Sequence, residues 1–397
     1  MIDGATQAAP DGVREETRVP EGGPGVVPDV AERLDAMADG LHAALATRPA
    51  VEYEQDSGPV YAALKRSRAT TMLIPAACGG RGASAVEAVR FQVALGALAP
   101  SAAVATTMHH YKIAALGRVA ATGDERAAAI LAELAGGARL VASGGAESMP
   151  GRDLRSLGSH AVRGPDGYRV TGLKRPCSLS TSMDTMSLMV ELRAPDGTPE
   201  GYAQAFVDAG AQGLEREPFW QSPAFRAAES HAVRLDAVRV APERVFPLLG
   251  EAGRRFATDC YTWFQLLISA SYLGVACCLA EATPEERRAG SRAWNEAAEG
   301  IRGLEAGLVE AAHAVDAGAD AAEQLDAATR ARDLVEDRLA GHGGQLLRAA
   351  GGGAFARTCF HALLAGALNA IAFHPPQRGA REGIGLESLA PDVRDRD

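Results

Sequence analysis

The sequence predicts an α+β fold in which a small antiparallel β-domain lies between two helical domains. Apolar residues recur at helical spacing from about residue 28 to residue 138, and helical spacing returns after residue 246. Between these two stretches, short alternating segments are separated by turn residues. We therefore expect a disordered tail over 1–27, an N-terminal helical domain over 28–138, a central β-domain over 139–245, a C-terminal four-helix bundle over 246–375 and a tail over 376–397.

The N-terminal helical domain begins at a recognisable start signal. Pro28 and Asp29 stand immediately before a run of apolar residues at helical spacing. Several alanine-rich helical stretches follow, up to about residue 138. Within them, Ser101 and Thr106-Thr107 mark an expected break between helices.

Two Pro-Asp-Gly turns, at 165–167 and 195–197, divide the central domain into short strands. The expected strands cover residues 168–171, 186–192, 203–207, 231–235 and 238–241. Short strands with turns between them favour an antiparallel sandwich or barrel.

The C-terminal domain is expected to contain one buried helix and several amphipathic helices. Residues 256–279 are mostly apolar, as in a buried helix. Residues 297–315 and 321–347 have amphipathic spacing. A last helix over 355–373 is expected to end at His374-Pro375-Pro376.

Composition excludes several classes of function. The net charge is −10 and no basic stripe is present, which argues against binding to nucleic acid or to an anionic membrane surface. The six cysteines form no C-x-x-C pair, so we expect neither a zinc site nor a disulfide framework, and we expect a reducing cytoplasm. We also expect no membrane span, and we expect no signal peptide because no charged region precedes an apolar run at the N-terminus.

Six local motifs resemble, in order, those of the acyl-CoA dehydrogenase superfamily. They are Ile74–Gly82 (L-P-x-x-x-G-G-x-G), Ala146–Leu154 (T-E-P-x-x-G-S-D-L), Gly167–Lys174 (G-Y-x-x-x-G-x-K), Lys174–Ser178 (K-x-W-I-T/S), Ser230–Val233 (G-S-x-x-V) and Gly351–Phe355 (G-G-x-G-Y). The resemblance covers most of the chain. It implies the helical–β–helical fold, a homodimer or homotetramer, and a flavin cofactor, which we expect to be FAD, with FMN or reduced flavin taken up as a substrate as the alternatives.

The resemblance assigns the flavin contacts to two groups of residues. The first is Ser143, Gly144, Ala146, Pro176, Cys177 and Ser178, and the second, at a subunit boundary, is Arg348, Gly351 and Gly352. Glycines let a backbone approach the flavin closely, and a small hydroxyl can bind near its N5 atom. Structural roles remain open as well, because Ser178 could be an ordinary strand-end serine and Gly351–Gly353 could simply end a helix.

The sequence departs from the family where the catalytic carboxylate is expected. Family dehydrogenases use a glutamate to take the α-proton of an acyl thioester while hydride leaves to the flavin. The commonest glutamate position falls on Pro375, beside His374, and the alternative position falls on Phe264. In addition, Pro176 replaces the tryptophan that shields the flavin, and Arg152 replaces the serine of the G-S-D motif.

Three activities are compatible with this pattern. The first is dehydrogenation of an acyl thioester, on CoA or a carrier protein, with a relocated base at His374, Glu382 or Glu387. The second is a flavin-dependent monooxygenase on the same fold, which receives reduced flavin and needs no glutamate; some of these end their last helix with a similar His-Pro element. The third is a redox-neutral reaction in a decayed flavin site. The family's commonest chemistry favours the first, in a specialised pathway.

Each activity implies its own partners. A dehydrogenase would need an acyl thioester and an electron acceptor, whereas a monooxygenase would need a flavin reductase. As catalytic candidates we name His374, which could instead cap its helix, and Glu382.

His109-His110-Tyr111-Lys112 is the densest polar cluster of the N-terminal half, and it falls where the family's helices line the substrate cavity. Adjacent residues on a helix point about 100° apart, so the two histidines are a poor metal-binding pair. We expect one histidine to face the pocket and the other to face solvent. His110 and Arg152 are the predicted substrate-binding residues.

Overall fold

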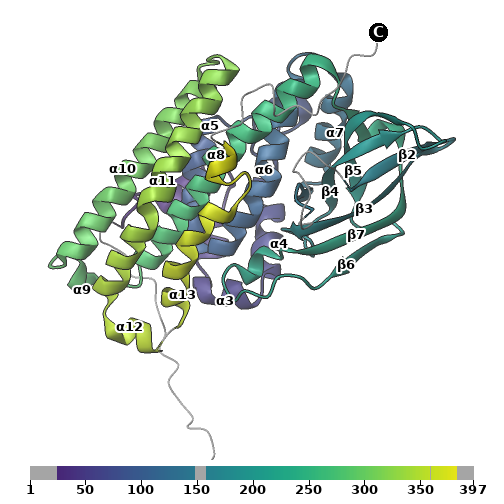
Figure 1. The fold of residues 1–397 in the computed structure, drawn as a ribbon. Helices are drawn as coiled ribbons and strands as arrows, with labels where there is room; N and C mark the ends of the chain where they lie inside the picture. The colour runs from purple at the N-terminus through teal and green to yellow at the C-terminus, as the bar shows by residue number, and fades with distance from the viewer. Residues whose placement is uncertain (1–24, 148–157, 358, 382–397) are drawn as a thin grey trace, which may run out of the picture.

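The computed structural model describes residues 25–147, 158–357 and 359–381. A β-sheet lies on one side of the molecule and long C-terminal helices lie on the other, with α5 and α6 between them (Figure 1). The predicted α+β class is therefore confirmed, with the elements in the order helices, strands, helices.

The N-terminal part is helical. Its elements are α1 (Val30–Asp35), α2 (Leu41–Leu45), α3 (Ala50–Gln55), α4 (Gly58–Arg66), η1 (Ala69–Thr71), η2 (Ala76–Cys78), α5 (Ala85–Leu98), α6 (Pro100–Ala120) and α7 (Glu125–Gly136). The helix α5 begins with a capping box, in which the Ser84 hydroxyl accepts from the Glu87 amide and the Glu87 carboxylate accepts from the Ser84 amide. The helices α5 and α6 are buried along most of their length.

The expected break at Thr106-Thr107 is wrong, because α6 continues through it to Ala120. Inside the helix, the Thr106 hydroxyl donates to the Ala102 carbonyl at 2.8 Å and the Thr107 hydroxyl to the Ala103 carbonyl at 3.2 Å. These bonds satisfy the buried hydroxyls without interrupting the backbone ladder. The helix α6 begins at Pro100. This start lies next to Ser101, which the sequence analysis named as the other residue of the expected break.

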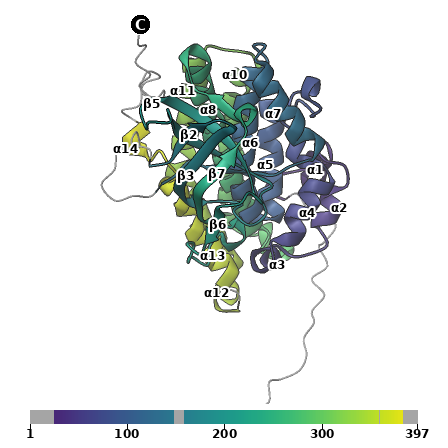
Figure 2. The ribbon, with the colours of Figure 1, turned by 90° about the vertical axis from the view of Figure 1, so that its right-hand side faces the viewer.

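The central part forms one sheet. Its strands are β1 (Val141–Gly144), β2 (His160–Gly164), β3 (Gly167–Cys177), β4 (Thr185–Arg193), β5 (Pro199–Asp208), β6 (Leu214–Glu217), β7 (His231–Val240) and β8 (Val245–Pro247), with η3 (Arg226–Ala228) and η4 (Pro242–Arg244) between them. The strand order is β6-β7-β3-β2-β4-β5-β8, and β1 pairs with β4. From the sheet side, the strands lie in front of the long helices α8 and α11 (Figure 2).

Two details of the sheet differ from the prediction. The pairs β1–β4 and β2–β4 are parallel, so the sheet is mixed, although its other pairs are antiparallel. The two strands expected at 231–235 and 238–241 are one strand, β7. Ala237 has a φ of 49°, and the register with β3 shifts there. Such a bulge places Asp236 and Ala237 both in solvent and interrupts the alternation that the sequence analysis relied on.

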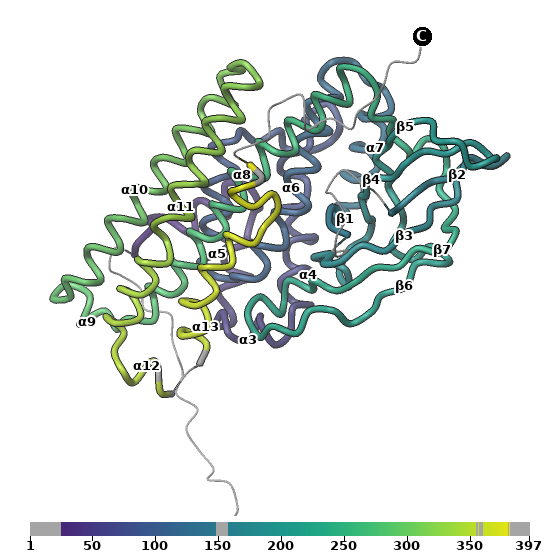
Figure 3. The backbone as a smooth tube through the Cα atoms, viewed as in Figure 1, coloured from purple at the N-terminus to yellow at the C-terminus, as the bar shows by residue number. Residues whose placement is uncertain are grey.

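The C-terminal part is helical again. Its elements are α8 (Gly250–Ala280), α9 (Glu285–Arg288), α10 (Arg292–Asp316), α11 (Ala321–Ala350), α12 (Gly352–Arg357), α13 (Cys359–Ala367), η5 (Leu368–Phe373) and α14 (Arg378–Arg381). The last expected helix is thus divided into α12, α13 and η5, although it ends at His374 as predicted. In Figure 3, α13 and the segment after it run alongside α8 and α11, in agreement with their contacts.

The helix α8 is the centre of the fold. It packs against α5, α6, α10, α11 and α13. It is long and apolar enough to cross a membrane by length and composition, but its most apolar window is completely buried inside the protein, as in a core helix. The helix α6, which packs against α8, also packs against β1 and η3 of the central part. Together α6 and α8 therefore connect the sheet to the helical bundle.

Candidate active site

The two sequence segments with predicted flavin contacts lie side by side. The Arg175 amide donates to the Ala146 carbonyl at 3.0 Å. The Cys177 thiol donates to the Ser143 carbonyl, with 3.8 Å between sulfur and oxygen. The structure thus brings segment 143–146, from β1 and the loop after it, against segment 176–178, at the end of β3.

A tyrosine from α6 joins this assembly. The Tyr111 hydroxyl and the Ser143 Oγ are 2.6 Å apart. Burial raises the pKa of Tyr111, so its phenol keeps its proton at neutral pH and can donate a hydrogen bond. Gly145, the next residue but one after Ser143, is exposed and leaves the backbone accessible at this point. Tyr111 was recognised in the sequence only as part of a polar cluster, because its partner lies 32 positions away.

Several of the predicted flavin residues have packing roles in this structure. A Cβ on Gly144 would lie 2.6 Å from Met186 Cε, the flexible end of a side chain, and 3.1 Å from Leu188 Cβ, so β1 packs closely against β4 at this point. Cys177 is fully buried, and burial raises the pKa of its thiol to about 12. The Ser178 hydroxyl lies 3.0 Å from the Ser230 hydroxyl. Flavin contacts by these residues remain predictions.

A buried ion pair fixes the end of the β1 segment. Lys174, on β3, is fully buried, and its Nζ lies 2.6 Å from Glu147 Oε1. Glu147 also accepts from the Gly158 amide at 2.6 Å and from the amide and hydroxyl of Ser159 at 3.1 and 2.7 Å. Although burial of Glu147 acts to raise its pKa, Lys174 and these donors lower it overall, so the carboxylate stays ionised. The pair therefore ties β1, β2 and β3 together beside the predicted flavin contacts.

The expectation that His109 or His110 faces solvent is wrong, because both are buried. His109 accepts from the Val141 amide at Nδ1 (3.0 Å), and its Nε2 lies 2.7 Å from the Thr70 carbonyl. With Nδ1 accepting, Nε2 carries the proton and donates, so His109 fastens β1 to η1. His110 packs edge-on against Phe91, and a substrate contact by His110 stays a prediction.

His109 predicts a loss of stability in acid. Burial lowers its pKa from 6.5 to about 4, so the unfolded chain takes up a proton first as the pH falls. The stability that depends on neutral His109 is therefore complete above pH 6.5 and is lost as the pH falls to about 4. The expected loss is about 3 kcal/mol in the free energy of unfolding.

The measurement is urea unfolding at several pH values between 7.5 and 4. His109→Gln is the matched variant, since an amide can keep both hydrogen bonds but does not titrate. Its stability should fall less steeply over this range than that of the unchanged protein. Equal slopes for the two proteins would show that His109 does not carry the effect.

Aromatic side chains from α6, α8 and the segment after η5 form a cluster beside Ser143. Tyr111 and Phe264 meet edge-on with ring centroids 5.4 Å apart, and Phe264 lies 6.2 Å from the His374 ring. His374 also meets Tyr272, with centroids 5.6 Å apart. This aromatic cluster, Tyr111, Phe264, Tyr272 and His374, joins the predicted flavin contact Ser143 to the predicted catalytic residue His374. Phe264 stands in it at a position where family dehydrogenases were expected to carry a glutamate.

His374 has the properties of a neutral hydrogen-bonding group. Its Nε2 lies 3.0 Å from the Tyr272 hydroxyl. Burial, and then the nearby charge of Arg332, lower its pKa to about 3. An imidazole with so low a pKa is a weak base, because it holds a proton poorly at neutral pH. A role as the catalytic base therefore stays a prediction that the electrostatics do not favour.

Arg332, on α11, holds His374 in place through hydrogen bonds to the backbone. Its guanidinium donates to the carbonyls of Ile371 at 3.2 Å and His374 at 2.8 Å, and to the side chain of Gln265. Arg332 is fully buried, and its guanidinium carbon lies 5.7 Å from the centre of the Phe264 ring. The contact of Arg332 with the His374 backbone could not be predicted from the sequence, because Arg332 has the spacing of an ordinary residue of an amphipathic helix.

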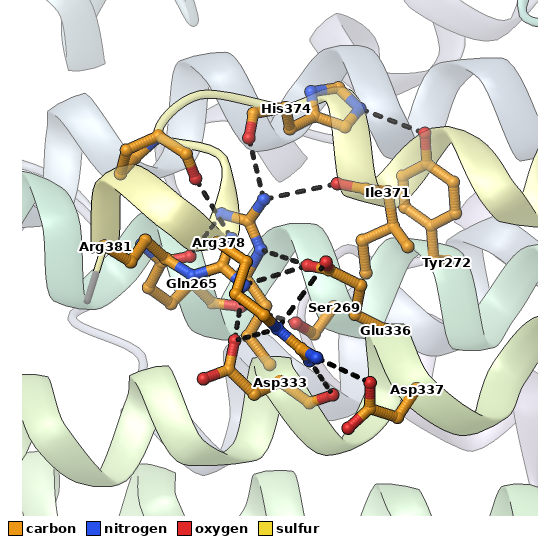
Figure 4. A network of polar contacts seen from close by, with 12 residues as sticks. Gln265, Ser269, Tyr272, Asp333, Glu336, Asp337, Ile371, His374, Arg378 and Arg381 are labelled. Carbon is orange, nitrogen blue, oxygen red and sulfur yellow. Dashed lines mark hydrogen bonds and ion pairs between the residues drawn. The ribbon is translucent and has the colours of Figure 1, made fainter.

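Two further arginines fasten the same segment. Arg381 donates to the Pro376 carbonyl at 3.0 Å and lies 2.9 Å from Glu336. Arg378 donates to Asp337 at 2.7 Å and to the Asp333 carbonyl at 2.9 Å. Residues 371–381 are thereby held against α11 by side chains at both ends of the segment (Figure 4).

The remaining predicted residues lie elsewhere. Arg348, Gly351 and Gly352 lie at the junction of α11 and α12, on the far side of the bundle from the sheet (Figure 1). Gly351 has a φ of 82° and ends α11, which fits the helix-ending role left open above. Their expected contact with a cofactor at a subunit boundary stays a prediction. Arg152, Glu382 and Glu387 lie outside the described residues.

Comparisons with known proteins agree with this architecture. No family model matches the chain. The chain is 38% identical over 363 residues to isobutylamine N-hydroxylase of Streptomyces viridifaciens, covering 88% of this chain and 93% of that protein. Among solved structures, KijD3 in complex with dTDP has a TM-score of 0.73 at 20% identity, with 91% of this chain and 96% of that one covered. FMN-bound TdsC from Paenibacillus sp. A11-2 has a TM-score of 0.71 at 19% identity, with 90% and 95% covered.

The fold is that of the acyl-CoA dehydrogenase-like flavoproteins KijD3 and TdsC, so the predicted fold is confirmed. The chain belongs to the family of isobutylamine N-hydroxylase, and it is therefore an enzyme of the oxidoreductase class.

Proposed function

We propose that this protein is a flavin-dependent monooxygenase that N-hydroxylates a primary amine. The observation that carries the proposal is the aromatic cluster, in which Phe264 stands where a dehydrogenase would place its base. At the two positions where family dehydrogenases are expected to carry this glutamate, the chain has Phe264 and Pro375, neither of which can act as a base. The close similarity to an amine N-hydroxylase supports the same chemistry. Acyl-thioester dehydrogenation, which the sequence alone favoured, lacks such support.

The residues beside the aromatic cluster fit a flavin. The backbone at Gly145 is exposed, and a Cβ there would lie no closer than 3.8 Å to the nearest of its neighbours, which leaves room for a planar ring. The hydroxyls of Ser143, Tyr111 and Ser178 stand close by and could meet the polar edge of the ring. Similar folds hold FMN in TdsC and FAD in PigA, so either flavin is compatible with this site.

A bound flavin would supply the two electrons that activate dioxygen. One oxygen atom forms the new N–O bond, the other leaves as water, and the amine loses one N–H bond. The reduced flavin must come from a partner, and we infer a flavin reductase for this role. The homo-oligomer expected from the superfamily is compatible with this scheme.

The chain's own residues bind and orient the amine. The rings of Phe264, Tyr111 and His374 would exclude water from the alkyl part of the substrate. His374 remains neutral and can offer a hydrogen bond to the amine nitrogen from the ring nitrogen that does not face Tyr272. Arg332 fixes the backbone on which His374 stands, which keeps this hydrogen bond in one direction.

The test supplies purified protein with each substrate class in turn. With isobutylamine, dioxygen and flavin kept reduced by a separate reductase, we expect a hydroxylamine heavier than the amine by one oxygen atom. In anaerobic solution with oxidised flavin, short-chain acyl-CoA should leave the flavin absorbance unchanged. Bleaching of the flavin by the thioester, with no hydroxylamine from any amine, would replace the proposal with dehydrogenation.

A further inference from the structure

We propose that this site accepts its amine as the free base and repels the ammonium form, so that at neutral pH it favours weakly basic amines. The inference rests on the proposed N-hydroxylation and adds the protonation state of the substrate to it. The feature that leads to it is a pair of positively charged side chains placed against the aromatic cluster.

The two rings nearest Ser143 each face a cation already. Lys112 Nζ lies 5.1 Å from the centre of the Tyr111 ring, and the Arg332 guanidinium carbon lies 5.7 Å from the centre of the Phe264 ring. The two rings themselves touch edge-on. Aromatic rings can bind an ammonium group through their electron-rich faces. Here each of the two rings already meets one cation of the protein, so a further cation placed against these rings would meet repulsion.

Lys112 has no negative partner in the described part of the chain. Its Nζ contacts Gln204 Oε1 at 3.5 Å and Cys260 Sγ at 3.9 Å, and it forms no ion pair there. Burial raises the pKa of the Cys260 thiol to about 11, so the sulfur is uncharged at neutral pH. Burial acts to lower the pKa of Lys112, but its contacts with Cys260 and Tyr111, which include a hydrogen bond to the Tyr111 hydroxyl, leave that pKa above its ordinary value, so the lysine keeps its charge at neutral pH.

The nearby carboxylates are already neutralised by arginines. Asp259, next to Cys260 on α8, lies 2.9 Å from Arg255 and 3.7 Å from Arg118. Glu336, one turn from Arg332 on α11, lies 2.9 Å from Arg381, 3.8 Å from Arg378 and 4.0 Å from Arg332 (Figure 4). Asp259 is therefore already paired and is not a partner of Lys112, and Glu336 is shared among three arginines, so it offsets the charge of Arg332 only in part.

The other titratable side chains around the cluster are neutral. Burial raises the pKa of Tyr111, Tyr261 and Tyr272, and burial with Arg332 lowers that of His374 to about 3. The charges closest to the rings are thus positive, on α6 and on α11. Positive neighbours destabilise an ammonium group and lower the pKa of a bound amine. N-hydroxylation needs the free lone pair of the nitrogen, so this field favours the reactive form.

The experiment measures binding of isobutylamine to the purified flavin-bound protein by calorimetry, with no reductant and hence no turnover. Affinity is determined between pH 7 and pH 10, in two buffers of different ionisation enthalpy. We expect the dissociation constant to fall about tenfold per pH unit until the amine's own pKa is reached, with about one proton released per amine bound. A fluorinated ethylamine of low basicity should bind more tightly than ethylamine at pH 7.

Two variants, each of which removes one positive charge, distinguish an effect of Lys112 on the bound amine from a general effect of the protein's net charge. Lys112→Met removes a positive charge beside Tyr111 and should reduce both the proton release and the dependence on pH. Arg292→Met removes a positive charge from a side chain that is 91% exposed on α10 and should change neither. Circular dichroism of both variants confirms that they are folded.

The outcomes separate the inference from the proposed function. Binding that is independent of pH and releases no proton, in a protein that still forms the hydroxylamine, would overturn the inference and leave N-hydroxylation standing. Absence of amine binding at every pH, together with absence of product, would remove both.

Discussion

Glu147→Gln is expected to lower the free energy of unfolding by about 3–5 kcal/mol, because it leaves the ammonium of Lys174 buried without a negative partner. Lys174 is fully buried, and its remaining hydrogen bond, to the Met189 carbonyl at 3.3 Å, carries no charge. The exchange preserves the size and shape of the side chain, so lost packing cannot account for the effect. The measurement is equilibrium unfolding in urea at neutral pH.

Two comparisons make this prediction specific. Lys174→Met should cost less than Glu147→Gln, since Glu147 keeps its bonds to Gly158 and Ser159 and a methionine suits a buried position. Glu217→Gln, in the exposed pair with Arg234, should leave stability unchanged within error. A smaller loss from Glu147→Gln than from Lys174→Met would contradict the account of this pair.

The Glu147 pair also has a definite pH dependence. The folded-state pKa of Glu147 is lowered, so its stabilising contribution is complete above the unfolded value near pH 4.5. The contribution is lost as the pH falls from there through the folded-state pKa. The pair should thus begin to weaken only near the lower end of the pH range in which His109 takes effect.

Arg332→Met is expected to lower the free energy of unfolding by about 3 kcal/mol, because it removes the side-chain donor of the His374 carbonyl and leaves the Ile371 carbonyl with only the His374 amide, at 3.3 Å. It should also reduce the turnover number about tenfold to a hundredfold by releasing the segment that carries His374. Substrate affinity should change less than turnover, since Phe264 and Tyr111 remain. Arg332→Lys, which can reach only part of the network, should recover part of both losses.

The matched control for Arg332 lies on the same helix. Arg330→Met removes an arginine whose side chain is 68% exposed and whose ion pair within the described residues is with Asp326, so stability and turnover should stay close to those of the unchanged protein. Full activity of Arg332→Met, measured on the folded fraction, would show that the function of His374 does not depend on its hydrogen bond with Arg332.

The fold could be predicted from the sequence because its signals are local. The strands follow two Pro-Asp-Gly turns, and α8 follows from an apolar stretch too long for a strand. The errors arose where side-chain bonds within a helix removed an expected break, and where a bulge interrupted the alternation of a strand. Thr106 and Thr107 satisfy their hydroxyls inside α6, and Ala237 interrupts the alternation of β7 without ending it.

The site was predictable only where it follows a family motif. The segments 143–146 and 176–178 were identified from their resemblance, and the structure places them together. The roles of His109, Tyr111 and Arg332 depend on partners 32 to 42 positions away, in Val141, Ser143 and His374. Single-residue patterns carry no information about such pairings, so these roles required the three-dimensional structure.

The most direct test of the central claim is the origin of the oxygen atom in the product. The purified protein is incubated with isobutylamine, reduced flavin and isotopically labelled dioxygen, and the product is analysed by mass spectrometry. Our account predicts a hydroxylamine that contains one labelled oxygen atom and forms only when the protein is present. A hydroxylamine without the label, or an amine left unchanged while an acyl thioester is oxidised by the same protein, would contradict it.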